Sequence, residues 1–226
     1  VLFRSVPIIE KARELLAPDP EVLSDPKAHY DQVLELNLTR LEPYVVGPHS
    51  PDRARPISEL AKEIADPKNG FVEGISVALM GSCTNSSYED MSRSADVADQ
   101  AKAHGLTTSV PFLVTPGSEQ VRATIERDGQ MASLADFNGT VLANACGPCI
   151  GQWKRAKALD GVPNTIVTSY NRNFPARNDG QPTTMNFIAS PEIVTAFALA
   201  GRLSFNPLTD TLTDSNGGSF RLTPPR

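Results

Sequence analysis

Short apolar runs alternate with helix-length segments between residues 75 and 201, and this alternation constrains the fold more than any other feature of the sequence. Four runs have the length and composition of buried strands: 75–80, 109–115, 140–145 and 165–170. Helix signals stand between and after them: Gly105 closes 88–104, Ser118 precedes 119–128, and Pro191 opens 190–201. Strands that alternate with helices form mostly parallel sheets covered by those helices. We therefore predict the α/β class, as a three-layer α/β/α domain with a mostly parallel sheet.

The first 42 residues follow a different pattern. We expect a short helix over 8–16, and then a strand in which Leu34, Leu36 and Leu38 alternate with polar residues. Prolines then cluster between residues 43 and 56, as is typical of an extended connector. We place the domain boundary there, and we expect a helix over 57–65 to open the next domain. Residues 1–42 are expected to be the partial end of a preceding α/β domain, and 43–226 an α/β domain with a C-terminal connector.

Composition excludes several classes of protein. The chain has 226 residues, and a formal net charge of -5 argues against binding nucleic acid by phosphate neutralisation. No apolar run reaches the roughly 18 residues that a membrane span needs. A count of three cysteines is low for a chain of this length, and it is odd, so it does not indicate a secreted disulfide framework. The count favours a reducing compartment, where thiols serve metal or redox chemistry.

Three polar motifs directly follow predicted strands. They are Gly81-Ser-Cys-Thr-Asn-Ser86, Cys146-Gly-Pro-Cys-Ile-Gly-Gln-Trp153 and Asn171-Arg-Asn-Phe-Pro-Ala-Arg177. In open parallel sheets, ligands bind beyond the carboxyl ends of the strands. We therefore expect all three cysteines and two arginines to lie on one functional edge: Cys83, Cys146, Cys149, Arg172 and Arg177.

Several kinds of site use thiols in such numbers. Cys146-Gly-Pro-Cys149 by itself is a dithiol redox unit of the thioredoxin type. The three cysteines with His104 would make a zinc site, but His104 ends a helix about 25 Å long at 1.5 Å per residue, which should place it far from the other ligands. A four-iron cluster held by three cysteines keeps one iron with an open position, which can act as a Lewis acid. Arginine forks beside it would bind carboxylates through paired hydrogen bonds.

Taken together, the motifs resemble those of the aconitase family, in its mitochondrial-type form. The resemblance runs from about Leu34 to Asp210, and its most specific parts are 81–86, 144–153 and 169–179. It implies a hydro-lyase that interconverts citrate and isocitrate through cis-aconitate. It also implies that Cys83, Cys146 and Cys149 ligate a 4Fe-4S cluster whose fourth iron binds the substrate, so that 43–226 would be the cluster-binding domain.

The same resemblance assigns roles to residues 171–177, which we call the arginine loop. Arg172 and Arg177 match arginines that hold substrate carboxylates, and Asn171 matches a residue that lines the cluster pocket. Ser86 and Gln152 are expected to support the site. The catalytic base and the acid machinery of the family lie in other domains, so we expect no catalytic residue in this chain. Its partners would be a tricarboxylate substrate and the remaining domains of the full-length enzyme.

The chain starts without methionine, and we interpret it as an internal fragment that would be inactive alone. The expected compartment is the mitochondrial matrix or the bacterial cytoplasm. Homoaconitase and isopropylmalate dehydratase share the cysteine spacing and are alternatives within the same family. From other classes, a redox module and a cluster-free RNA-binding relative are also alternatives; the acidic charge balance disfavours RNA.

Overall fold

The computed structural model describes residues 2–226, with side chains described over 6–157 and 159–226. The chain forms two compact units, 1–41 and 42–226, and each is described here by itself. Val1, which opens the predicted partial domain 1–42, lies outside the described residues. That the first unit is the end of a larger α/β domain stays a prediction.

The first unit contains short helices. They are α1 (Leu2–Lys11), α2 (Arg13–Leu16), α3 (Pro20–Ser24), α4 (Pro26–His29) and the 3-10 helix η1 (Leu38–Arg40). The helix predicted over 8–16 is present as the end of α1 and α2. The predicted strand around Leu36 is wrong, because this stretch makes no ladder in the described structure and Leu34 is 86% exposed. An alternating pattern becomes a strand only against a neighbouring strand and an apolar surface, and this stretch meets neither within its unit.

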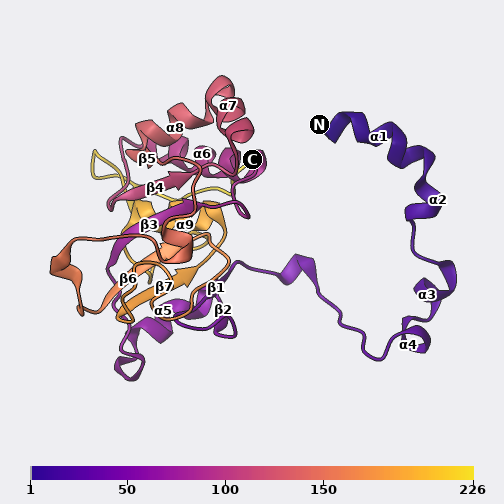
Figure 1. The fold of residues 1–226 in the computed structure, drawn as a ribbon, viewed down its shortest axis with the longest axis horizontal. Coiled ribbons are helices and arrows are strands. Elements are labelled where there is room, and N and C mark those ends of the chain that lie inside the picture. Colours follow the sequence, from indigo (N-terminus) through magenta and orange to yellow (C-terminus); the bar gives the residue numbers. More distant parts are fainter. Residues whose placement is uncertain (1) are drawn as a thin grey trace. The chain divides into compact units, whose positions relative to one another are not determined.

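The second unit is built on a seven-stranded sheet with the order β2-β1-β7-β6-β3-β4-β5 (Figure 1). The five strands from β3 to β7 pair in parallel, and β1 runs antiparallel to both β2 and β7. The mostly parallel α/β sheet predicted from the sequence is therefore confirmed. The bounds are β1 (Tyr44–Val46), β2 (Ala54–Pro56), β3 (Ile75–Gly81), β4 (Phe112–Thr115), β5 (Gly139–Val141), β6 (Asn164–Thr168) and β7 (Thr184–Ile188).

The proline-rich segment is not the extended connector that the sequence predicts. It forms the β1–β2 hairpin at one edge of the sheet, where Val45 pairs with Arg55. Arg55 is buried, its Nη1 donates to the carbonyls of Val45 and Gly47, and its Nε lies 3.2 Å from Glu63 Oε1. Proline is tolerated at strand ends and at sheet edges because it only lacks a donor, and an edge hairpin therefore satisfies the same sequence.

Helices flank the sheet (Figure 1). Helix α9 packs against β3 and β6, α6 packs against α8 and α9, α8 also covers β5, and α5 packs against β1 and β2. The bounds are α5 (Ile57–Ala65), α6 (Tyr88–Ala103), α7 (Glu119–Asp128), α8 (Gln130–Asp136) and α9 (Pro191–Ala200), with the 3-10 helices η2 (Pro67–Asn69), η3 (Pro148–Ile150) and η4 (Lys157–Leu159). A two-stranded sheet of β8 (Leu212–Thr213) and β9 (Ser219–Phe220) follows α9.

Strand β3 divides the apolar core between the two faces of the sheet. Ala78 and Met80 belong to the large core with α6 and α9, whereas Val77 and Leu79 belong to a smaller cluster on the other face. This is the period of two that a strand buried on both faces imposes. Tyr170, Trp153 and Cys149 are among the residues that complete the smaller cluster, so the segment that carries Cys149 packs on this second face.

We expect the start of α6, just after the Cys83 turn, to depend on its capping box. Ser87 Oγ accepts from the Asp90 N–H, and Asp90 Oδ2 accepts from the Ser87 N–H at 2.9 Å. Ser87→Ala should therefore lower the free energy of unfolding by about 1 kcal/mol in a urea titration. Thr124→Ala is the control, because that hydroxyl only bonds back to the Gln120 carbonyl inside α7. Equal losses in both variants would contradict a specific capping role.

Candidate functional site

The three cysteines meet at the carboxyl edge of the sheet, as the sequence predicts. Cys83 follows β3, and Cys146 and Cys149 follow β5. All three line one cavity of about 80 Å³, together with residues that follow β4. Its other lining residues are Ser82, Thr115, Pro116, Gly117, Asn144 and Ala145. The loops after three adjacent parallel strands thus enclose a thiol-lined space.

The Cys83 turn has a backbone that requires glycine before it. Gly81 has φ +129°, and a Cβ there would lie 2.0 Å from the Thr115 carbonyl oxygen. The Gly81 N–H donates to Ser169 Oγ at 2.8 Å, and the buried Ser86 hydroxyl donates to the Ser82 carbonyl. The first bond ties the turn to Ser169, which follows β6, and the second closes the turn on itself. That Ser86 supports the site stays a prediction.

Cys146 and Cys149 lie on a tight turn that includes η3. The N–H groups of Ile150 and Gln152 both donate to the Gly147 carbonyl at 3.1 Å. Cys83 and Cys146 are exposed and Cys149 is half-buried. Burial, and then the neighbouring Cys146 thiol, raise the pKa of Cys149. A bound cation would have to offset that effect, because a thiol must lose its proton to become a ligand.

The arginine loop lies beside the cysteine turns without lining their cavity. Asn171 Nδ2 lies 3.3 Å from the Oγ1 of Thr84, the residue next to Cys83, and a Cβ on Gly151 would lie 3.2 Å from the Arg177 carbonyl oxygen. Arg172 is exposed and donates to the Asn171 carbonyl, whereas Arg177 is half-buried and its Nε has no hydrogen-bond partner in the described structure.

Neither Arg172 nor Arg177 forms an ion pair with a carboxylate of the described residues, although other arginines of the chain do. No carboxylate of the described residues therefore competes with an external anion for either guanidinium group. A guanidinium offers several donors in a fixed plane that matches a carboxylate. The two arginines thus make the loop a candidate carboxylate-binding element next to the thiols.

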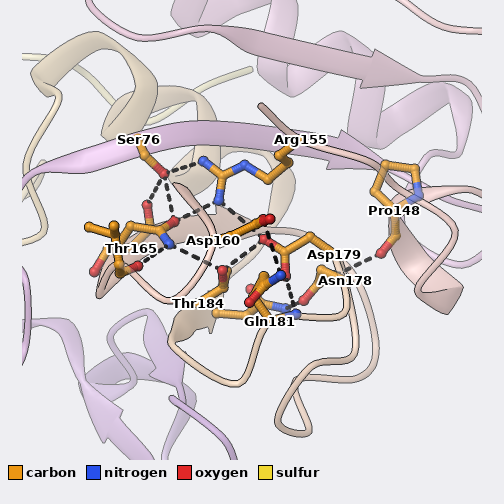
Figure 2. Close-up of polar contacts among 12 residues, drawn as sticks. Ser76, Pro148, Arg155, Asp160, Thr165, Asn178, Asp179, Gln181 and Thr184 are labelled. Carbon is orange, nitrogen blue, oxygen red and sulfur yellow. Dashed lines mark hydrogen bonds and ion pairs between the residues drawn. The ribbon is translucent and has the colours of Figure 1, made fainter. Parts of the chain in front are cut away.

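A polar network that the sequence analysis missed supports these loops (Figure 2). Arg155 Nη1 lies 3.3 Å from Asp179 Oδ2, and the two side chains are only 9% and 3% exposed. Arg155 also donates to Asn164 Oδ1 at 2.6 Å and to Ser76 Oγ at 2.9 Å, while Thr184 donates to Asp179 at 2.7 Å. The network joins the cysteine segment, the arginine loop and three strands. Asp179 ends the 169–179 motif and Arg155 closely follows the 144–153 motif. This proximity was the signal in the sequence that could have pointed to the pair.

His104 does not complete a zinc site with the cysteines. Its ring stacks on Phe220 at 3.7 Å between centroids, and its Nδ1 lies 3.9 Å from Asp214 Oδ2. None of these residues lines the cysteine cavity. Over 6–157 and 159–226, where side chains are described, no group of three or more His, Cys, Asp or Glu side chains is arranged so that it could hold a metal ion. Over the same residues, no helix is both long and apolar enough to cross a membrane.

Comparisons with known proteins agree on one family. The model of the Aconitase family (aconitate hydratase) matches residues 5–201. The probable mitochondrial aconitate hydratase of Dictyostelium discoideum is 58% identical over 204 residues, which cover 90% of this chain and 26% of that protein. The mitochondrial aconitate hydratase of Saccharomyces cerevisiae is 59% identical over 202 residues, covering 89% of this chain and 26% of that protein.

The chain spans about a quarter of the length of these curated relatives. Among solved structures, the crystal structure of Thermococcus kodakaraensis aconitase X in its holo-form matches 57% of this chain and 25% of that chain. The sequence identity is 17% and the TM-score is 0.32.

Proposed function

This chain belongs to the aconitase family, and from that premise we propose that it is the cluster-bearing part of an aconitate hydratase. The complete enzyme would interconvert citrate and isocitrate through cis-aconitate. One observation carries the proposal: three cysteines from the ends of two strands, β3 and β5, line one cavity, beside a loop with two arginines that have no carboxylate partner among the described residues. The names of the relatives support mitochondrial aconitate hydratase over the related dehydratases as the activity.

The donor set of the cavity fits a 4Fe-4S cluster. Thiols are the ionisable groups that line it, and soft thiolate ligands suit iron-sulfur clusters. Cys83, Cys146 and Cys149 would hold the cluster. The Cys83 turn is fixed by a hydrogen bond from Gly81 to Ser169, and the Cys146–Cys149 turn by bonds to the Gly147 carbonyl. When bound, the cluster would supply a Lewis acid at an iron without a protein ligand.

The residues of this chain would bind and orient the substrate. Arg172 and Arg177 would each bind one carboxylate of the substrate. With two of its carboxylates fixed, a tricarboxylate would present one defined bond to the cavity. Asn171, held near Thr84, would offer its amide between the arginines and the Cys83 turn. Proton abstraction beside a carboxylate needs a positioned base. We place that base, and the acid that acts on the hydroxyl, in the remaining domains of the enzyme.

Anaerobic reconstitution of the 226-residue chain with iron and sulfide tests this proposal. The expected product is brown and contains about four irons per chain. It should bind citrate without forming aconitate, because the base lies elsewhere. A colourless protein with a titratable dithiol would instead support a redox module built on Cys146 and Cys149. Turnover near that of a complete enzyme would refute the assignment of the base to another domain.

The arginine loop makes a second prediction about binding. Arg177→Lys should raise the dissociation constant for citrate on the reconstituted chain about tenfold, because a lysine cannot make the paired, planar contact. Arg172→Lys should act in the same direction. Isothermal titration measures both, with Arg122→Lys as control, since Arg122 pairs with Glu119 and Glu126 on the exposed surface of α7. An unchanged citrate affinity in both loop variants would remove the arginines from the binding site.

A further inference from the structure

A buried amide connects the cysteine turn to the arginine loop. Asn178 is 3% exposed, and its Nδ2 donates to the Pro148 carbonyl at 2.9 Å (Figure 2). Pro148 lies between Cys146 and Cys149. The other end of the same amide accepts from Asn186 Nδ2, also at 2.9 Å. Asn178 thus donates to a carbonyl of the cysteine turn and accepts from an amide of the sheet.

Asn186 extends this connection to Arg172. It lies on β7, is 2% exposed, and also donates to the Arg172 carbonyl at 3.3 Å. Its Oδ1 lies 3.0 Å from the Thr168 hydroxyl, and that hydroxyl lies 3.4 Å from the Tyr170 N–H, which donates to it. The Thr168 hydroxyl proton is therefore free to point at Asn186, which orients both amides with their donors toward the loop carbonyls.

We propose that Asn178 is a positioning residue that, through Asn186, couples the Cys146–Cys149 turn to the Arg172–Arg177 loop. The inference rests on the proposed function and deepens it, because it assigns the spacing between thiols and arginines to one hydrogen-bonded relay. Both partners of Asn178 are loop or side-chain groups, so the relay adds nothing to the strand ladder. Its neighbour Asp179 anchors the loop separately through Arg155 and Thr184.

Two substitutions separate the bonds of this relay. Asn178→Ser is too short to reach Pro148 or Asn186, and it therefore breaks both contacts. Asn178→Asp keeps an acceptor for Asn186 and replaces the donor to Pro148 with a repelling oxygen. Asn69→Ala is the matched control, because Asn69 Nδ2 also donates to a backbone carbonyl, that of Glu63, at 2.9 Å. If the aspartate beside Asp179 prevents folding, Asn178→Ser carries the test.

Hydrogen exchange of the iron-free 226-residue chain, read by mass spectrometry, measures the coupling. In Asn178→Ser, peptides that cover 146–153 and 171–180 should exchange about tenfold faster, as expected when a buried hydrogen bond no longer holds a turn closed. The peptide over 92–103 should not change, because it lies inside α6, which packs against α8 and α9 and not against either loop. Unchanged exchange over 146–153, or an equal rise over 92–103, would overturn the proposal.

A second measurement uses the reconstituted chain. Citrate should alter the absorption spectrum of the wild-type cluster, and Asn178→Ser should need about tenfold more citrate for the same change, an ordinary coupling between two sites. Asn69→Ala should match the wild type. If the exchange effect is present but no iron is taken up, the coupling of the loops stands and the cluster assignment fails. If iron is taken up but neither measurement responds, the positioning role is wrong.

Discussion

Cys146→Ser is expected to abolish cluster assembly, lowering the iron content from about four to below about one per chain. The side chain is exposed, so serine should leave the fold intact, and the loss would reflect the missing thiolate alone. The chain has three cysteines, so no other cysteine can replace the lost ligand. Iron and sulfide analysis after anaerobic reconstitution measures the effect, with thermal unfolding of the iron-free protein as the check on folding.

Cys83→Ser separates the cluster from the redox alternative. Cys83 lies on a different turn from the Cys146–Cys149 pair, so its loss would leave a dithiol unit complete. The cluster proposal expects Cys83→Ser to lose iron as fully as Cys146→Ser does. Absence of iron from both the wild type and Cys83→Ser, together with a reversible Cys146–Cys149 disulfide retained in Cys83→Ser, would establish the redox alternative instead.

Asp179→Asn is expected to lower the free energy of unfolding by about 3–5 kcal/mol, because it leaves the Arg155 guanidinium buried without a counter-charge. That is a large share of the 5–15 kcal/mol that typically stabilises a domain. Urea unfolding monitored by Trp153 fluorescence measures the loss. Trp153 suits this purpose because the Arg155 guanidinium lies 5.0 Å from its ring centroid.

The matched control is Asp128→Asn. Asp128 pairs with Arg127 on the surface, with 2.6 Å between Oδ1 and Nε, and exposed pairs contribute little. We therefore expect no resolvable change in its unfolding midpoint. A second comparison is Arg155→Met combined with Asp179→Leu, which removes both charges and should recover much of the lost stability. Equal stabilities of Asp179→Asn and wild type would show that the pair is solvated in solution.

Local signals predicted the elements that are stabilised locally. Helices α5 and α7 have the predicted bounds, and Ser118 caps α7 by accepting from the Val121 N–H at 3.1 Å. Strand β4 is shorter than the predicted run, because the Ser109 N–H bonds to the Ala198 carbonyl rather than to a strand. Caps and helical periodicity are properties of adjacent residues, whereas the ends of strands depend on their partners.

Strand β7 was missed for the same reason. Its sequence, Thr-Met-Asn-Phe-Ile, is less apolar than the other runs, yet it is almost wholly buried between β6 and β1. Asn186 can be buried there because its amide is fully used by Thr168, Asn178 and Arg172. A sequence shows that polar residue but not the three partners that make its burial possible.

Part of the candidate site was predictable from the sequence and part was not. That strand-end motifs meet at one edge follows from the parallel topology, and so the gathering of the cysteines was predictable. The supporting residues were not, because Arg155 meets Ser76 from 79 residues away, and such contacts depend on the register of β3 against β6. A charged residue near a motif resembles a solvated side chain until the fold shows that it is buried.

The order of the strands also sets an order of events. Strand β4 lies between β3 and β5, so the turns that bear Cys83 and Cys146 come together only after three parallel strands have paired. Parallel pairing closes long loops and is slow compared with local structure. An emerging polypeptide would therefore carry its thiols apart, unable to collect iron, until the sheet is complete. Iron would then bind only after the strands have paired, and its binding would stabilise the folded state by mass action.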